Sequence, residues 1–143
     1  GIDRSLPALS VAAANASQLG LGERARMLHA DWDEPGWARE LGGPFDLVLA
    51  NPPYVEEAAE LAPAVRGHEP AGALFAGAAG LAAYRRLIPQ IPGLLTPGGI
   101  ALVEIGHAQA DAVTALAAAA GLTANLHRDL AGRPRVLELV HIC

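Results

Sequence analysis

The stretch best suited to carry chemistry is Asn51-Pro52-Pro53-Tyr54, which directly follows the apolar run 45–50. Neither proline has a backbone N–H and each fixes its own φ, so the chain leaves the run in an extended, stiff conformation. Such a turn can hold the Asn51 amide oxygen and the Pro52 carbonyl side by side as two hydrogen-bond acceptors. They would accept both hydrogens of a substrate –NH2 group and leave the nitrogen lone pair facing outward, beside an aromatic wall from Tyr54. The alternative is an ordinary Pro-Pro turn after a strand.

The elements that must position this stretch alternate between strands and helices. The run 45–50 reads as a strand buried on both faces, and ligands of open α/β sheets bind beyond the carboxyl ends of such strands. The alternation predicts an α/β fold with a mostly parallel sheet, helices on both faces and a C-terminal antiparallel hairpin. The predicted helices are 5–19, a weak 35–41, 80–95 kinked at its prolines, and 108–120, with a possible turn at 56–61. The predicted strands are 2–3, 26–30, 45–50, 100–105, 122–128 and 135–142, with a turn at 97–99.

Two further predicted strand ends carry polar or aromatic groups. Asp3 could accept hydrogen bonds from ribose hydroxyls, or it could instead stabilise the start of the helix that begins near Ser5. Asp31 and Trp32 could pair with and stack on an adenine, or Trp32 could simply pack at the rim of the sheet. Together with Asn51, these strand ends favour an adenosine-containing cofactor.

Composition and charge exclude several classes of function. The net charge is −5 and all ten basic residues are arginines scattered along the chain, which disfavours a nucleic-acid-binding surface. The only cysteine is Cys143 and the five histidines lack ligand spacing, so we expect no disulfide and no metal site. We expect no membrane segment and a cytoplasmic protein. Glu69 and Glu104 are further candidates, each more compatible with a structural than a catalytic role.

Several stretches of the chain resemble the catalytic domain of the release-factor glutamine N5-methyltransferases, the HemK family. The Asn-Pro-Pro-Tyr stretch is shared with adenine-N6 DNA methyltransferases, but other stretches are more specific. These are His68-Glu69-Pro70 and the stretch Asp129-Leu130-Ala131-Gly132-Arg133. Further matches lie at 8–20, 31–32, 80–86, 97–99 and 104–106.

This resemblance implies a Rossmann-like methyltransferase that uses S-adenosyl-L-methionine as methyl donor. It implies that Asp3 binds the ribose, that Trp32 with Asp31 flanks the adenine, and that Asn51 touches both cofactor and substrate. It also implies that Asn51, Pro52, Pro53 and Tyr54 bind the target glutamine, which in this family lies in the Gly-Gly-Gln loop of peptide-chain release factors. The expected partner is therefore a release factor, with no DNA and no membrane.

The resemblance also implies segments that are not found in this sequence. Family members have a strand and a Gly-rich loop before the position of Gly1, as well as an N-terminal helical domain. We therefore interpret residues 1–143 as a partial catalytic domain whose first strand and Gly-rich loop are missing. We expect the chain alone neither to bind the cofactor nor to methylate a release factor. The alternatives are an adenine-N6 nucleic-acid methyltransferase and a catalytically inactive fragment.

Overall fold

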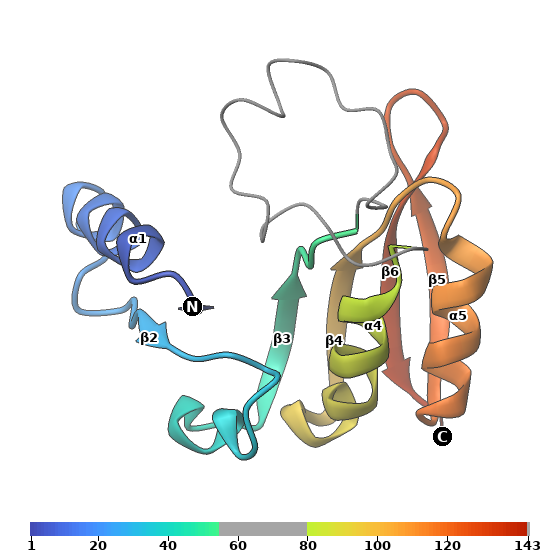
Figure 1. Ribbon diagram of the computed structural model, residues 1–143, viewed down its shortest axis with the longest axis horizontal. Coiled ribbons are helices and arrows are strands. Elements are labelled where there is room, and N and C mark those ends of the chain that lie inside the picture. The colour runs from blue at the N-terminus through green and yellow to red at the C-terminus, as the bar shows by residue number, and fades with distance from the viewer. Residues whose placement is uncertain (55–79, 143) are drawn as a thin grey trace. The chain divides into compact units, whose positions relative to one another are not determined.

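The computed structural model describes residues 1–54 and 80–142 (Figure 1). The chain divides into two compact units, Gly1–Gly43 and Pro44–Cys143. The interpretation of residues 1–143 as one partial domain stays a prediction. The predicted turn at 56–61 and the candidate Glu69 lie outside the described residues.

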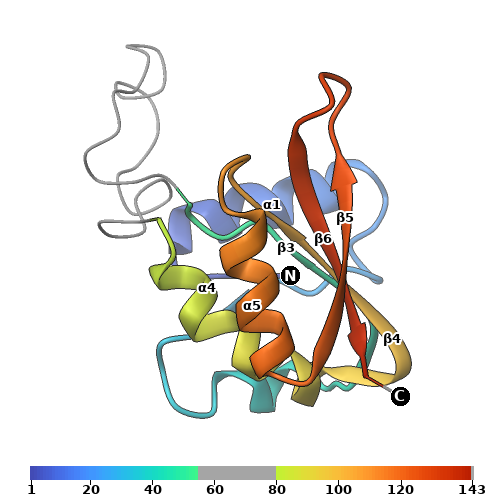
Figure 2. The same cartoon turned by 90° about the vertical axis from the view of Figure 1, so that its right-hand side faces the viewer.

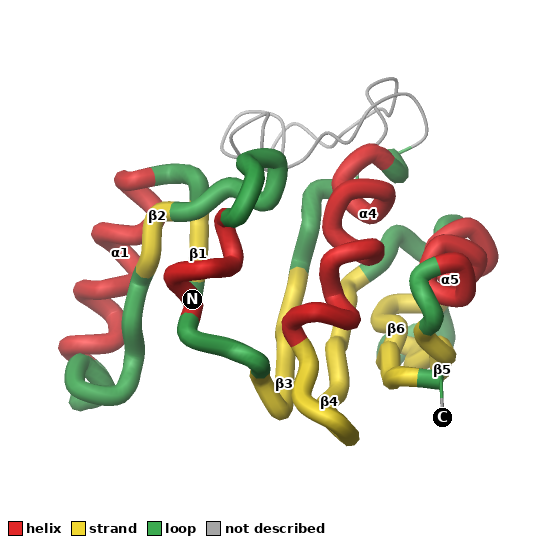
Figure 3. Tube along the Cα trace, turned by 90° about the horizontal axis from the view of Figure 1, so that it is seen from below, coloured by secondary structure: helices red, strands yellow, loops and turns green. Residues whose placement is uncertain are grey.

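The first unit contains two short parallel strands and one long helix. Strand β1 (Ile2–Asp3) pairs with β2 (Leu28–His29), and helix α1 (Leu6–Gln18) lies alongside the pair (Figure 3). The helix begins as predicted, because Oγ of Ser5 accepts the N–H of Ala8 at 3.3 Å and caps the first turn. The helix ends one residue earlier than predicted, because Leu19 follows the last helical residue, and the Leu19 side chain is 72% exposed.

Two predicted elements of this unit are smaller than the sequence suggested. The predicted strand 26–30 is reduced to β2, because β1, the strand it pairs with among the described residues, is itself two residues long. The predicted weak helix 35–41 is a 3₁₀ helix, η1 (Trp37–Leu41). Gly36 and Gly42 flank it in the left-handed conformation, with φ of +78° and +76°, and this conformation ends a right-handed helix on either side.

The second unit is built on a four-stranded mixed sheet. Its strands lie in the order β3-β4-β6-β5, with β3 parallel to β4 and the two other pairs antiparallel (Figure 1). The predicted C-terminal hairpin is thus confirmed, and β6 lies between β4 and β5. The bounds are β3 Phe45–Ala50, β4 Leu95–Glu104, β5 Leu122–Arg128 and β6 Pro134–His141.

One face of this sheet is covered by helices. Helices α4 (Ala82–Leu87) and α5 (Ala110–Ala119) lie side by side over it (Figures 2 and 3). The chain continues from α4 as a 3₁₀ helix, η2 (Ile88–Leu94), so the predicted kink takes the form of a change of helix type. Pro89 and Pro92 explain the change, because neither can donate the N–H that an α-helix requires. The core side chains between helices and sheet include Tyr84, Leu87, Ile88, Ile91, Val103, Ile105, Leu137 and Leu139.

Strand β4 begins earlier than predicted. The predicted turn at Pro97-Gly98-Gly99 lies inside the strand, where the pairing with β3 shifts register between Phe45 and Leu47. Gly98 has a φ of +83°, and a Cβ on Gly99 would lie 2.8 Å from the Phe45 carbonyl oxygen. The two glycines therefore form an irregularity within the strand, and the sheet continues on both sides of it.

The prediction that Phe45–Ala50 is buried on both faces is wrong. Leu47 is 51% exposed and Leu49 is 69% exposed. The physical reason is that β3 is an edge strand of its sheet, and α4, η2 and α5 cover the opposite face. In the middle of β4, Ala101 and Val103 are buried while Leu102 between them is partly exposed, which marks the same two faces.

Candidate functional site

A hollow of about 410 Å³ lies at the carboxyl ends of β3 and β4. The pairing of the strands explains its lining, because Leu49 lies opposite Leu102, and Glu104 lies opposite Val136. These side chains, with Ala50 and Asn51, form a mainly apolar hollow that carries one amide and one carboxylate. Pro52 is buried and Asn51 is exposed. The turn is therefore packed against the protein at Pro52, and the Asn51 amide group is accessible to a ligand. The predicted placement of Asn51 just beyond a strand end is what the structure shows.

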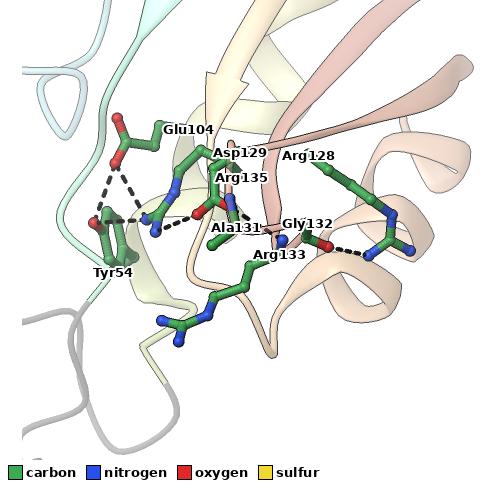
Figure 4. Close-up of polar contacts among 8 residues, drawn as sticks. All are labelled: Tyr54, Glu104, Arg128, Asp129, Ala131, Gly132, Arg133 and Arg135. Carbon is green, nitrogen blue, oxygen red and sulfur yellow. Dashed lines mark hydrogen bonds and ion pairs between the residues drawn. The ribbon is translucent and has the colours of Figure 1, made fainter.

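Tyr54 is held through its hydroxyl group. The hydroxyl donates to Oε1 of Glu104 at 3.1 Å, and Nη1 of Arg135 donates to the hydroxyl oxygen of Tyr54 at 3.5 Å (Figure 4). Arg135 also pairs with Glu104, at 3.7 Å. Burial and the hydrogen bond to the Glu104 carboxylate raise the pKa of Tyr54, so the phenol stays protonated at neutral pH. The ring can serve as the predicted aromatic wall, and its hydroxyl links three segments of the chain.

The tip of the β5–β6 hairpin positions Arg135. Oδ1 of Asp129 accepts the N–H groups of Ala131 and Arg133, at 2.9 Å and 3.0 Å, and so closes the turn (Figure 4). Its other oxygen, Oδ2, pairs with Nη2 of Arg135 at 3.4 Å. The bond from the Arg133 N–H is the largest of the effects that lower the pKa of Asp129. The Asp-Leu-Ala-Gly-Arg stretch therefore has a structural role, which is to aim the Arg135 guanidinium at Tyr54 and Glu104.

Glu104 is anchored through its backbone as well as its side chain. The hydroxyl of Tyr84, a fully buried side chain, donates to the Glu104 carbonyl at 3.0 Å. Burial raises the pKa of this phenol. The interpretation of Glu104 as a structural residue is consistent with these contacts, which tie the end of β4 to α4 and to the turn at Tyr54.

The candidate cofactor residues lie in the first unit. Strands β1 and β2 run parallel in register, and the Ala30 N–H donates to the Asp3 carbonyl at 3.2 Å, so Asp3 and Asp31 follow the same edge. Oδ1 of Asp3 accepts the N–H of Ser5 at 2.7 Å, the contact expected of a residue that stabilises the start of α1. Oδ1 of Asp31 accepts the N–H of Asp33 at 3.0 Å, and Trp32 is half-buried.

The structure thus brings together two groups of predicted residues, each within its own unit. Asp3, Asp31 and Trp32 belong to the first, and Asn51 to Tyr54 belong to the second. The roles of all seven residues in binding stay predictions. Sequence reasoning gave no role to Arg135, Tyr84 or Gln109, the last of which bonds to the backbone at Tyr54. The one available signal was that Gln109 and Arg135 are polar residues close to recognised stretches.

Comparison with known proteins places the chain in a family. No family model matches it. Over 141 residues, 96% of the chain, it is 49% identical to the release factor glutamine methyltransferase of Caulobacter vibrioides, of which it covers 47%. In sequence, the chain matches the release factor glutamine methyltransferases, the HemK family. It spans about half the length of the curated relatives it matches.

A second group of relatives modifies a different protein. The chain is 46% identical over 107 residues to the ribosomal protein uL3 glutamine methyltransferase of Neisseria meningitidis. The match covers 74% of this chain and 34% of that protein. Among solved structures, it resembles a ribosomal protein L11 methylase from Lactobacillus delbrueckii subsp. bulgaricus. The TM-score is 0.65 at 20% identity, over 99% of this chain and 56% of the other. The predicted Rossmann-like methyltransferase fold is confirmed.

Metal sites and membrane spans are absent from the residues that the structure describes. No group of three or more His, Cys, Asp or Glu side chains within residues 1–54 and 80–142 could hold a metal ion. None of the helices in the described part of the chain combines the length and the hydrophobicity that a membrane span requires.

Proposed function

We propose that this chain is part of an enzyme that transfers a methyl group from S-adenosyl-L-methionine to the side-chain amide nitrogen of a glutamine in a peptide-chain release factor. The observation that carries the proposal is the 49% identity, over nearly the whole chain, to a release factor glutamine methyltransferase. The turn at Asn51 supports it, because an amide group stands at the carboxyl end of β3 and lines an open hollow.

In this proposal, Asn51 and Pro52 bind the substrate amide. The Asn51 side-chain oxygen and the Pro52 carbonyl accept the two hydrogens of the glutamine –NH2 group, and Tyr54 packs against the substrate. An amide nitrogen is a poor nucleophile because its lone pair is delocalised. Holding it in line with the transferred group, with both hydrogens bonded, favours lone-pair character on nitrogen. The nitrogen would gain the methyl group as the bond from that group to sulfur breaks, and it would then release one of its two hydrogens as a proton to water at the open hollow. Orientation of this kind can lower a barrier by several kcal/mol, up to about 7–11 kcal/mol in favourable cases.

The candidate cofactor residues have the chemistry that the donor requires. S-adenosyl-L-methionine, when bound, supplies a methyl group activated by a positively charged sulfur atom. Asp3 and Asp31 would accept hydrogen bonds from the ribose and the adenine amino group, and Trp32 would lie against the base. The exposed position of Asp3 at the end of β1 and the half-buried indole of Trp32 fit these roles.

Glu104 would position the site without removing a proton. Its carboxylate already accepts a hydrogen bond from Tyr54 and pairs with Arg135. Both contacts hold the carboxylate group toward the turn. Glu104 therefore favours a fixed orientation of the Tyr54 ring beside the hollow that both Asn51 and Glu104 line.

A glutamine of ribosomal protein uL3 is the second candidate substrate. The 46% identity to uL3 glutamine methyltransferases over 107 residues favours it, although the match covers less of the chain. The two candidates share the same chemistry at the amide and differ in the protein that presents it.

Transfer of labelled methyl groups tests the proposal. The natural protein that carries this chain is incubated with methyl-labelled S-adenosyl-L-methionine and, separately, with a release factor, ribosomal protein uL3 or DNA. We expect label in the release factor, and none when the glutamine of its Gly-Gly-Gln loop is replaced by asparagine. Label in uL3 alone would support the second candidate, and label in DNA would contradict both.

A further inference from the structure

We propose that Gln109 is a positioning residue that sets the location of the Asn51–Tyr54 turn, and this inference rests on the proposed function. The side chain of Gln109 bonds to three backbone groups that are far apart in the sequence. Its Nε2 donates to the Tyr54 carbonyl at 2.9 Å and to the Gly80 carbonyl at 3.2 Å. Its Oε1 accepts the N–H of Gly106 at 3.0 Å.

This pattern of partners determines which way the amide group faces. Two carbonyl oxygens can only accept hydrogen bonds, so the –NH2 end of Gln109 must point to Tyr54 and Gly80. The Gly106 N–H can only donate, so it faces the amide oxygen. A flipped amide would place oxygen against two carbonyls and nitrogen against a donor, losing every one of these contacts. We refer to Gln109 and these three backbone groups as the Gln109 clamp.

Two glycines leave the space that the clamp needs. Gly80 has a φ of +62°, and a Cβ there would collide with both Nε2 of Gln109 and the Tyr54 carbonyl oxygen. A Cβ on Gly106 would lie 2.8 Å from Oε1 of Gln109 and 3.4 Å from Cδ2 of Tyr54. Any larger residue at either position would push the Gln109 amide away from its partners.

The clamp acts on the end of the turn that the prolines cannot control. Pro52 and Pro53 stiffen the turn internally, so a displacement at Tyr54 is transmitted to Asn51. The Tyr54 hydroxyl is held by Glu104 and Arg135, and its carbonyl is held by Gln109. Tyr54 is therefore fixed at both ends, and the Asn51 acceptor is fixed with it.

The geometry predicts that the clamp matters mainly for turnover. Gln109→Met keeps the length and shape of the side chain but removes every hydrogen bond of the clamp. A misplacement of about 1 Å can cost about 100-fold in rate, so we expect kcat to fall about 10- to 100-fold. KM for the release factor and affinity for S-adenosyl-L-methionine should change little, because in the proposed function other groups of the chain contact the substrate and the cofactor. Gln109→Glu should be at least as damaging, since its carboxylate would face two carbonyl oxygens.

A matched control is Gln90→Met in the natural protein that carries this chain. It makes the same chemical change, but Nε2 of Gln90 donates to the Arg86 carbonyl, four residues earlier in the same helical segment. The control variant should keep the normal kcat. Gly80→Ala attacks the same clamp from the opposite side and should lower kcat as Gln109→Met does, which provides a second route if the methionine variant fails to fold.

The clamp itself is measured separately from activity, by the exchange rate and chemical shift of the Gly106 amide proton. Gln109→Met should speed its exchange and shift its resonance, whether or not the protein methylates a release factor. If the protein transferred no methyl group, the proposed function would be contradicted. The exchange rate and chemical shift of the Gly106 amide would still test the clamp. Normal kcat in folded Gln109→Met, or an unchanged Gly106 amide, would overturn the positioning role.

Discussion

The hydroxyl group of Tyr84 should contribute measurably to the stability of the second unit. The side chain is fully buried, and its hydroxyl donates to the Glu104 carbonyl at 3.0 Å. Tyr84→Phe removes one oxygen atom and leaves the ring in place, so it creates almost no cavity. The loss is then the hydrogen bond itself, about 0.5–1.5 kcal/mol net, rising to about 1–3 kcal/mol where the buried carbonyl stays unpaired. We expect a decrease of about 1–2 kcal/mol in the free energy of unfolding.

Hydrogen exchange in the native state measures this loss where it occurs. A decrease of about 1–2 kcal/mol corresponds to about a 5- to 30-fold rise in the population of the opened state. The amides of β4 and β6 that exchange by opening of the sheet should lose protection by that factor. Both tryptophans, Trp32 and Trp37, lie in the first unit, so their fluorescence reports any spread of the effect beyond the second unit.

Tyr54→Phe is the matched control, because it makes the same chemical change at a hydroxyl group that is only partly buried. Its partners Glu104 and Arg135 have side-chain exposures of 32% and 35%, so water can replace the lost bond. We expect a decrease of less than about 1 kcal/mol. Equal protection of the β4 amides in Tyr84→Phe and in the unchanged chain would refute the assignment of the buried hydrogen bond.

Three further outcomes are expected. The pKa values of Tyr54 and Tyr84 are both raised above 10.0. The protonated hydroxyl groups therefore contribute fully to the free energy of unfolding below pH 10.0, and this contribution is lost as the pH rises through the raised pKa values. Absorbance at the phenolate wavelength should thus lag behind free tyrosine, and full ionisation near pH 10 with native circular dichroism would contradict this. In the complete enzyme, Asn51→Ala should cost about 1–3 kcal/mol, mainly in kcat; a change in KM alone would argue against the two-acceptor arrangement. Trp32→Ala in the complete enzyme should weaken S-adenosyl-L-methionine binding by about 1–3 kcal/mol, measured by calorimetry. Normal binding would instead support the alternative that Trp32 packs at the rim of the sheet.

Local sequence patterns predicted the elements whose boundaries are set by local chemistry. Strand β3 begins and ends where the apolar run meets Pro44 and the Asn-Pro-Pro turn, and α1 starts at its Ser5 cap. Predictions were wrong where tertiary pairing decides the outcome. Pro97-Gly98-Gly99 has the composition of a turn, yet pairing with β3 continues on both sides of it and makes it part of β4. The exposure of Leu49 likewise depends on which face the helices cover, and the apolar composition of β3 does not reveal that.

The sequence predicted the position of Asn51 in the candidate site, but it did not predict the side chains that hold the turn in place. Asn51 could be placed because the end of a strand and two prolines are visible in the sequence. Gln109 and Arg135 could not, because they contact Tyr54 from positions 55 and 81 residues away. Contacts over such separations are set by the order β3-β4-β6-β5, which brings the hairpin tip and the start of α5 toward the turn. A sequence without aligned relatives gives no direct sign of them.

The prolines and the side chains that bond to Tyr54 restrain the Asn51–Tyr54 turn in different ways. Two prolines fix the internal dihedral angles of Asn51–Tyr54, but they remove backbone donors and so cannot tie the turn to its surroundings. The ties must come from carbonyl oxygens and from Tyr54, which is where the structure has them: Gln109 on the carbonyl, Glu104 and Arg135 on the hydroxyl. A stiff turn converts a small displacement at one end into an equal one at the other. Positioning of Asn51 should therefore be as sensitive to these distant side chains as to the prolines themselves.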